Sequence, residues 1–366
     1  MEGALAIAEG LLRQPTVPFH EDLPRQFCID FAKERGLDVH EDPAGNLVLR
    51  YESAGANTDE PLVLVAHLDH PGFVVDTVEA GIASMTFHGG LASVNAVEGS
   101  PVNFFRTGEV EPCGWGGLLA ADELNGRLTG ATAEVVEGDA GDLAMWGFPG
   151  WSIEDDRITA RVCDDLLGAA AILACLDEVV RRAPAGVAVW GLLTRAEEVG
   201  FLGALEAIRL GTVPSGASVL SLECSKALPD APQGGGVIVR VGDRMTIFDP
   251  GLTEALRTAA DLVLDEDPTF RYQRKLMDGG SCEATAFCAS GFRASGIAVP
   301  LGNYHNAQDS GPGIAAETVL VADWLAEVQL LVALACRPSL LDPGTLDPPA
   351  WLAERSALAR QALGAP

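Results

Sequence analysis

The stretch RITARVCDDLLGAAAILACLDEVVRR, residues 157–182, decides the fold expected for this chain. Apolar and polar residues alternate from 158 to 162, which predicts a strand, and apolar residues then recur at helical spacing. Asp164 and Asp165 stand at the junction. Open α/β sheets bind ligands at the carboxyl ends of their strands, and a cation would relieve the repulsion between crowded acids there. The simpler interpretation is a helix N-cap, so partners elsewhere in the chain decide between the two.

Strand and helix patterns alternate on both sides of a region of different character. Residues 1–72 and 157–336 predict one discontinuous catalytic domain, an α/β fold with a mixed, mostly parallel sheet flanked by helices. Residues 73–156 are rich in glycine and short β-like runs, which predicts an inserted small β-barrel-like domain. Residues 337–366 contain several prolines and are expected to form a C-terminal tail with a short helix.

Within the catalytic domain the patterns predict individual elements. The continuous apolar run at 62–65 is typical of a strand covered on both faces. Helices are expected over 2–13, 21–35, 197–210 and 315–336.

The composition excludes several classes of partner. The chain has 24 basic and 52 acidic residues and a net charge of -28, which argues against binding to nucleic acid or anionic membranes. No apolar run is long enough to span a bilayer, and the acidic first residues do not resemble a signal peptide. The eight cysteines include no C-x-x-C pair and are expected to be reduced thiols of a cytoplasmic protein.

Acids and histidines follow the predicted strands, and together they suit two metal ions. This set comprises His67, Asp69, Asp164, Glu197, Glu198, Glu223 and His305. Asp164 can bridge both ions, with His67 and Glu223 completing one site. His305 and one of the paired glutamates would complete the other site, and the remaining glutamate would be the general base. Asp69 could accept the imidazole N–H of His67 and fix its tautomer. The residues alone leave open which glutamate has which role.

The order and spacing of these motifs resemble the dinuclear metallo-aminopeptidases of the tetrahedral, glutamyl and deblocking type, within a wider clan of dizinc peptidases and deacylases. The matching segments are DPAGN (42–46), AHLDHPGFVV (66–75), FHGG (87–90), RVCDDLLG (161–168), TRAEEVGFLGA (194–204), LECS (222–225), GGSCEA (279–284) and VPLGNYHN (299–306). The resemblance implies Glu197 as the base, Glu198 as a ligand and a cis peptide bond after Asp164.

Four departures from the family pattern accompany this resemblance. Leu166 stands where relatives usually carry arginine, and His70 where they usually carry glutamate. Glu223 replaces the commoner aspartate ligand and is one methylene longer. Cys282 and Glu283 replace threonine and aspartate. The acidic character of the proposed ligand set survives, so hydrolase chemistry is expected to survive.

The expected function is an aminopeptidase that removes N-terminal residues from peptides with a water activated by two divalent ions. Zinc is the first expectation for both ions, with cobalt or manganese as alternatives. A deacylase, a carboxypeptidase or another amidohydrolase could use the same site, and a non-catalytic metal-dependent binding or scaffold protein is an alternative of another class. Arg195 and Lys226 lie near the motifs and could hold a carboxylate, although we favour the interpretation that both are solvated.

The resemblance also implies self-association through the inserted domain. A homodimer or a higher homo-oligomer is expected, with Trp115, Trp146 and Trp151 as candidate contacts. The alternative is that some of these aromatic side chains fill the core of the inserted domain itself.

Overall fold

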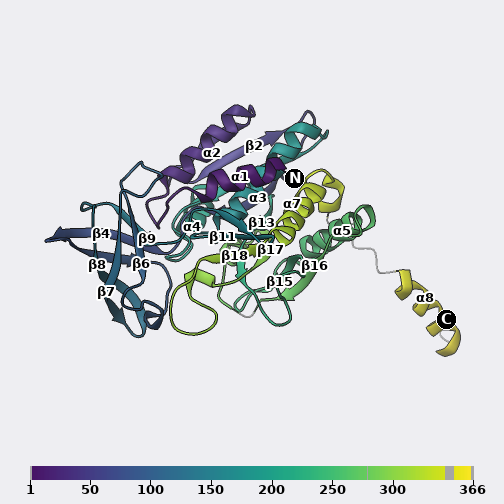
Figure 1. Ribbon diagram of the computed structural model, residues 1–366. Helices are drawn as coiled ribbons and strands as arrows, with labels where there is room; N and C mark the ends of the chain where they lie inside the picture. The colour runs from purple at the N-terminus through teal and green to yellow at the C-terminus, as the bar shows by residue number, and fades with distance from the viewer. Residues whose placement is uncertain (1, 278, 343–349, 364–366) are drawn as a thin grey trace.

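The computed structural model describes residues 2–277, 279–342 and 350–363 and contains an α/β unit and a closed barrel (Figure 1). The expected fold class is confirmed. The α-helices are α1 (Glu2–Leu12), α2 (Asp22–Glu34), α3 (Leu166–Arg182), α4 (Leu202–Leu210), α5 (Pro250–Glu266), α6 (Glu283–Ala289), α7 (Val321–Ala335) and α8 (Ala350–Leu363). Short 3-10 helices are η1 (Ser93–Asn95), η2 (Tyr304–Asn306) and η3 (Pro338–Leu341).

The main sheet has nine strands in the order β1-β2-β12-β3-β13-β17-β15-β16, with β14 paired to β17. Strands β12, β3, β13 and β17 run parallel to one another at its centre. Strands β1 and β2 are antiparallel to their neighbours, and β15 is antiparallel to β17 but parallel to β16. The strands are β1 (Asp38–Glu41), β2 (Leu47–Glu52), β3 (Leu62–His67), β12 (Ala188–Thr194), β13 (Ser218–Ser221), β14 (Cys224–Lys226), β15 (Val237–Gly242), β16 (Tyr272–Leu276) and β17 (Arg293–Leu301).

Helices cover both faces of this sheet, as the side chains of β3 require. Leu62, Leu64 and Ala66 join the core beneath α1, α3, α5 and α7. Val63 and Val65 point to the other face and join the core beneath α4 and α6. Successive strand residues point to opposite faces, so a strand buried on both faces has a continuous apolar sequence. This is the pattern that predicted the strand.

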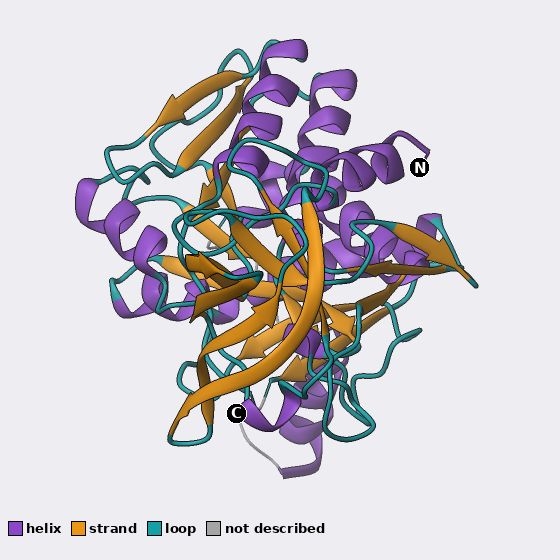
Figure 2. Cartoon of the chain, turned by 60° about the vertical axis from the view of Figure 1, so that its left-hand side comes forward, coloured by secondary structure: helices purple, strands orange, loops and turns teal. Residues whose placement is uncertain are grey.

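The barrel closes in the order β4-β5-β8-β7-β6-β9 and lies to one side of the main sheet (Figure 1; it is brought forward in Figure 2). Phe73, Phe104 and Trp146 are buried in its core. Trp146 is therefore wrong as a candidate contact between subunits, whereas Trp115 is 66% exposed. The strands are β4 (Gly72–Glu79), β5 (Ile82–His88), β6 (Pro101–Phe105), β7 (Gly114–Leu124), β8 (Arg127–Glu134) and β9 (Leu143–Trp146).

A small three-stranded sheet follows the barrel and corrects one expected element. It consists of β10 (Ser152–Glu154), β11 (Arg157–Ala160) and β18 (Glu317–Leu320). The helix expected over 315–336 begins only at Val321, because Glu317–Leu320 pairs antiparallel with β11 instead. Tertiary pairing has overridden the helical spacing of this segment.

The C-terminal tail lies partly outside the described residues, which omit 343–349 and 364–366. Helix α8 contains the short helix expected there. Among the helices that are described, none combines the length and apolar character needed to cross a membrane. All eight cysteines are free thiols, which agrees with the absence of a C-x-x-C pair.

Candidate metal centre

The predicted site residues come together at one edge of the main sheet. His67 ends β3, Glu223 follows β13 and His305 follows β17, and these three strands are parallel. The carboxyl ends of parallel strands meet at one edge, which is why distant residues converge there. Glu197 and Glu198 follow β12, and they precede α4 rather than lying in its first turn as expected. Asp164 follows β11 of the small sheet.

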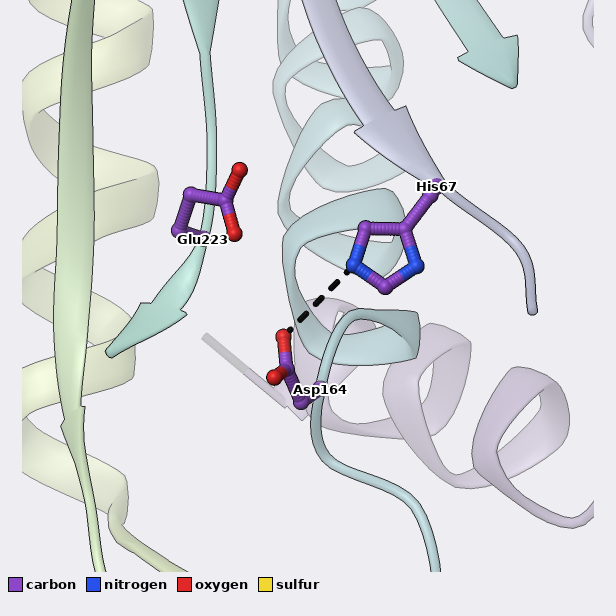
Figure 3. A group of neighbouring side chains, drawn as sticks. All are labelled: His67, Asp164 and Glu223. Carbon is purple, nitrogen blue, oxygen red and sulfur yellow. Dashed lines mark ion pairs between the residues drawn. The ribbon is translucent and has the colours of Figure 1, made fainter. Parts of the chain in front are cut away.

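Four groups of possible ligands lie among the described residues, and the two that match the predicted sets both contain Asp164. The other two are His67 with Glu197 and Glu198, and Asp164 with Asp165 and Cys224. In the first predicted set, one ligand atom from each of His67, Asp164 and Glu223 lies within 4.8 Å of the others (Figure 3). Asp164, Glu198 and His305 meet the same criterion in the second group. The structure thus brings together the five residues predicted as ligands, in the two sets that the sequence predicted.

The separations within these groups suit ligands of a shared ion. His67 Nε2 lies 3.7 Å from Asp164 Oδ1, and His305 Nε2 lies 3.5 Å from Asp164 Oδ2. Two donors on one tetrahedral zinc ion would lie about 3.4 Å apart. His305 Nε2 also lies 3.0 Å from Glu198 Oε1. Two of these three separations are longer than the donor–acceptor distance of a hydrogen bond. All three pairs of atoms nevertheless lie closer together than side chains surrounded by water would need to.

Both histidines direct Nε2 into the centre because Nδ1 is engaged elsewhere. His67 Nδ1 donates to the backbone carbonyl of Asp69 at 3.0 Å, and His305 Nδ1 donates to that of Gly90 at 2.7 Å. A proton on Nδ1 leaves a lone pair on Nε2, which is the arrangement of a metal-binding imidazole. Gly90 lies between β5 and η1, so the inserted region helps to orient His305.

Asp69 has a wider structural role than the predicted contact with His67. Its Oδ1 lies 3.5 Å from His67 Nδ1. The two carboxylate oxygens accept the backbone N–H groups of Glu197 at 2.9 Å and Glu198 at 3.0 Å. Because charged acceptors make stronger hydrogen bonds than neutral ones, Asp69 fixes the loop that carries both glutamates.

Glu317, which was not predicted as a site residue, also fixes the backbone beside proposed ligands, here that of Asp164 and His305. Its buried carboxylate accepts the backbone N–H groups of Cys163, Asp164 and His305. His305 has a left-handed backbone conformation, with φ 54°, which is uncommon for a residue other than glycine. In the sequence, Glu317 is one acid within a segment whose apolar spacing also fits a helix, so nothing marked it as a site residue.

Two further features surround Asp164. The peptide bond between Asp164 and Asp165 is cis, as the family resemblance implied. His70 Nδ1 donates to the backbone carbonyl of Asp164 at 2.6 Å, and its Nε2 lies 3.1 Å from Asn306 Oδ1. His70, one of the departures from the family pattern, thus holds the backbone of Asp164 where the chain leaves β11 and enters the centre.

The electrostatics of the centre call for positive charge. Burial raises the pKa of Glu197 well above its usual value and raises that of Glu223 to about 7. Burial opposes a positive charge on His67 and His305, yet the surrounding carboxylates raise the pKa of both imidazoles. For Asp164, burial is outweighed by the two histidines, which lower its pKa. Divalent cations would supply the missing charge.

Unpartnered atoms show that the residues fit such cations. Among the described residues, Asp164 Oδ1, Glu198 Oε1 and His305 Nε2 are buried without a hydrogen-bond partner. His305 Nε2 lies 3.0 Å from Glu198 Oε1, but with the proton on Nδ1 it has no N–H to donate. Buried polar atoms are normally hydrogen-bonded, and ligation by a metal would satisfy all three. Imidazole nitrogen and carboxylate oxygen are also donors that zinc accepts.

Comparison with known proteins agrees with this geometry. A model of the family described as M42 glutamyl aminopeptidase matches residues 130–310. This match covers 181 of the chain's 366 residues, and over that stretch the chain is similar to the family. A cytosol non-specific dipeptidase of Escherichia coli (strain K12) is 38% identical over 56 residues, and the match spans 15% of this chain but only 12% of that protein.

Solved structures share the fold of this chain over most of its length. An aminopeptidase from the archaeon Desulfurococcus kamchatkensis is 19% identical, covers 93% of this chain and 97% of its own, and has a TM-score of 0.75. The Pyrococcus horikoshii TET1 peptidase is 20% identical, with 91% and 99% covered and a TM-score of 0.70.

Arg195 makes its hydrogen bonds within the protein itself. Its Nε donates to Glu21 at 2.6 Å and its Nη2 donates to the Phe19 carbonyl at 2.8 Å. The Glu21 carboxylate also accepts the Ala196 N–H, so this ion pair positions the start of the glutamate loop. The interpretation of Arg195 as a solvated cation is therefore wrong, whereas Lys226 has an exposed side chain.

Proposed function

We propose that this protein is a metal-dependent aminopeptidase that removes residues from the amino end of peptides. The observation that carries the proposal is the pair of ligand groups sharing Asp164, with His67 and Glu223 on one side and Glu198 and His305 on the other. The M42 family match supports the same activity. It does not favour the deacylase, carboxypeptidase, other amidohydrolase or scaffold alternatives.

The proposed cofactors are two divalent metal ions, with zinc first and cobalt or manganese as alternatives. The mixture of imidazole and carboxylate donors and the unpartnered atoms of Asp164, Glu198 and His305 support this assignment. When bound, two such ions would polarise the scissile carbonyl and make the attacking water more acidic.

Glu197 is the proposed general base. Its side chain is 10% exposed, and its Oε2 lies 3.9 Å from His67 Nε2 at the edge of the first ligand group. In our proposal its carboxylate removes a proton from water as the new C–O bond forms at the peptide carbonyl. The same carboxylate then gives that proton to the amine as the C–N bond breaks. Asp69 holds the Glu197 backbone in place through these steps.

The acidic surroundings favour a substrate with a free amino terminus. Asp164, Glu197, Glu198 and Glu223 gather at the centre, and a protonated α-amine would be attracted to any charge that the metals leave uncompensated. The test uses a matched pair of short peptides, one N-acetylated and one C-amidated, with products identified by mass spectrometry. We expect the amidated peptide to lose its first residue and the acetylated one to persist. Release of the C-terminal residue from the acetylated peptide would contradict the proposal.

We also propose that the protein forms at least a homodimer through its barrel. The Pyrococcus horikoshii TET1 peptidase assembles into a tetrahedron or a large octahedral shell. In this chain Trp115, Leu124 and Val136 of the barrel region are each at least 65% exposed, and large exposed apolar side chains are typical of interfaces. Light scattering at micromolar concentration should give a multiple of the chain mass, and Trp115→Glu should lower it. A wild-type monomer would contradict this proposal.

A further inference from the structure

An open groove of about 400 Å³ lies between the barrel and the loop that carries the paired glutamates. Its barrel wall comes from the end of β5 and from the turn that leads into β8, which begins at Arg127. On the other side the groove is lined by Val199, which directly follows the proposed ligand Glu198. The groove therefore borders the candidate metal centre as well as the barrel.

Two glycines connect this groove to the second ligand group. Gly89 lines the groove, and the backbone carbonyl of Gly90 accepts the N–H of His305 Nδ1 at 2.7 Å. A β-carbon on Gly90 would lie 2.9 Å from Arg127 Nη2 and 3.8 Å from His305 Nδ1. The guanidinium of Arg127 and the imidazole of His305 therefore lie against the same glycine. This arrangement places Arg127 within the reach of a short peptide bound at the centre.

Arg127 supplies the positive charge of this groove and has no partner of its own. Within the described part of the chain, its guanidinium forms neither a hydrogen bond nor an ion pair. The described lining of the groove contains no aspartate or glutamate, and burial lowers the pKa of His88, so this imidazole is neutral at pH 7. In a chain with a net charge of -28, an arginine without an acidic partner is available to an anion from outside.

The remaining lining of the groove suits a peptide that ends in a carboxylate. Leu128 and Val199 supply apolar surface, and Asn125 and Thr129 supply polar groups. A guanidinium binds a carboxylate through two parallel N–H···O hydrogen bonds. An extended chain advances about 3.3–3.6 Å per residue, so the carboxylate of a tripeptide lies roughly 7 Å beyond its first carbonyl. A carboxylate at that distance from the centre can reach Arg127.

We propose that this groove holds the part of the peptide that follows the scissile bond, and that Arg127 binds the C-terminal carboxylate of a short substrate. The inference rests on the proposed aminopeptidase function. It assigns a preference that depends on the far end of the peptide and on its length, whereas the identity of the first residue has no part in it.

The test measures kcat/KM of the metal-loaded enzyme for trialanine, trialanine amide and alanine p-nitroanilide. An ion pair at a partly exposed site should make trialanine about 3–10-fold better than its amide. Pentaalanine and its amide should differ little, because their C-terminus lies roughly 14 Å beyond the first carbonyl. An equally strong dependence on the carboxylate of pentaalanine would contradict binding at one fixed distance.

Substitutions of Arg127 test the residue itself. Arg127→Met should bring the ratio of trialanine to its amide close to one, and Arg127→Glu should invert the preference. Arg127→Lys should keep part of it, since an ammonium group retains the charge but loses the paired N–H geometry. Arg106→Met is the matched control, because it removes the same charge from an exposed barrel arginine that is paired with Glu137 and does not line the groove. It should keep the wild-type ratio.

The outcomes separate this inference from the proposed function. If the metal-loaded wild type hydrolyses neither alanine anilide nor the two tripeptides, the aminopeptidase proposal fails. If it hydrolyses alanine anilide and trialanine amide but does not prefer trialanine over the amide, only the assignment of the groove is overturned. This wild-type ratio decides the matter even if an Arg127 variant misfolds.

A further pair of substrates distinguishes the two possible sources of a carboxylate. Ala-Glu-Ala amide and Ala-Gln-Ala amide both lack a C-terminal carboxylate and differ in the side chain that follows the scissile bond. Arg127→Met should leave their relative rates nearly unchanged. If Arg127→Met instead removes a preference for the glutamate peptide and leaves the trialanine ratio as it is in the wild type, Arg127 recognises an acidic side chain. That result would overturn the assignment to the C-terminus.

Discussion

The barrel core and the edge of the main sheet are both buried, but they have opposite chemistry. In the barrel, the ring of Phe73 packs edge-on against Phe87 at 4.9 Å and Trp146 at 5.2 Å. At the sheet edge, Asp164 and Glu198 keep buried oxygen atoms without hydrogen-bond partners among the described residues. Removal of apolar rings from water stabilises the first region, whereas burial of acids destabilises the second unless cations bind.

This difference indicates that the sheet edge is shaped by function and supported from behind. Asp69 and Glu317 accept five backbone N–H groups between them and fix the loops that carry the proposed ligands. Their oxygen atoms are engaged, unlike those that face the centre. Acidic residues therefore have two roles here: some support the backbone behind the site, and others face the centre as proposed ligands.

The largest effect should follow the loss of the residue shared by both ligand groups. Asp164→Ala is expected to abolish tight binding of both ions and to reduce hydrolysis to the background rate. His67→Ala and His305→Ala should each weaken mainly one ion. Elemental analysis after dialysis, combined with anilide turnover, measures these effects. An Asp164→Ala enzyme with full metal content and activity would refute the shared-ligand assignment.

The paired glutamates should separate metal binding from proton transfer. Glu197→Gln keeps the size of the side chain but removes the base, so kcat should fall by roughly 10²–10⁴ while both ions remain. Glu198→Gln should lower metal occupancy instead. Metal content and kcat are measured on the same preparations. If Glu197→Gln loses metal and Glu198→Gln keeps it, the two roles are reversed.

The barrel should respond in the opposite way to the sheet edge. Phe104→Ala removes a fully buried ring and should lower the free energy of unfolding by about 3–5 kcal/mol. Folded Phe104→Ala protein should nevertheless retain metal, because Phe104 belongs to a separate core cluster. Denaturant unfolding and elemental analysis test the two statements. Loss of metal from the folded variant would show that the barrel core and the centre are coupled.

The smallest expected effect concerns the pH dependence of the metal-free protein. Burial raises the pKa of Glu283 to about 8 from an ordinary value of 4.5. Between these values the folded protein holds a proton that the unfolded chain releases, so this carboxyl makes stability fall as pH rises from about 5 to 8. The thermal midpoint of metal-free protein should follow this trend, and Glu283→Gln should flatten it. An unchanged slope in Glu283→Gln would exclude Glu283 as a source.

Local sequence was sufficient for most of the elements and for the residues that meet at the sheet edge, because both depend on short patterns. The apolar run of β3 predicted a strand buried on both faces, and strand ends predicted where His67 and Glu223 would lie. Glu317 was missed because its strand forms only by pairing with distant β11. The paired glutamates precede α4 because long-range hydrogen bonds to Asp69 hold them in a loop.

The most direct test of this account is the number of metal ions that the wild-type chain binds. Metal-free protein would be titrated with zinc by calorimetry, and the bound metal would be counted by elemental analysis. The shared position of Asp164 between two ligand groups predicts two ions per chain and hydrolysis of aminoacyl anilides that depends on them. A chain that binds one ion or none, or that is equally active without metal, would contradict the account.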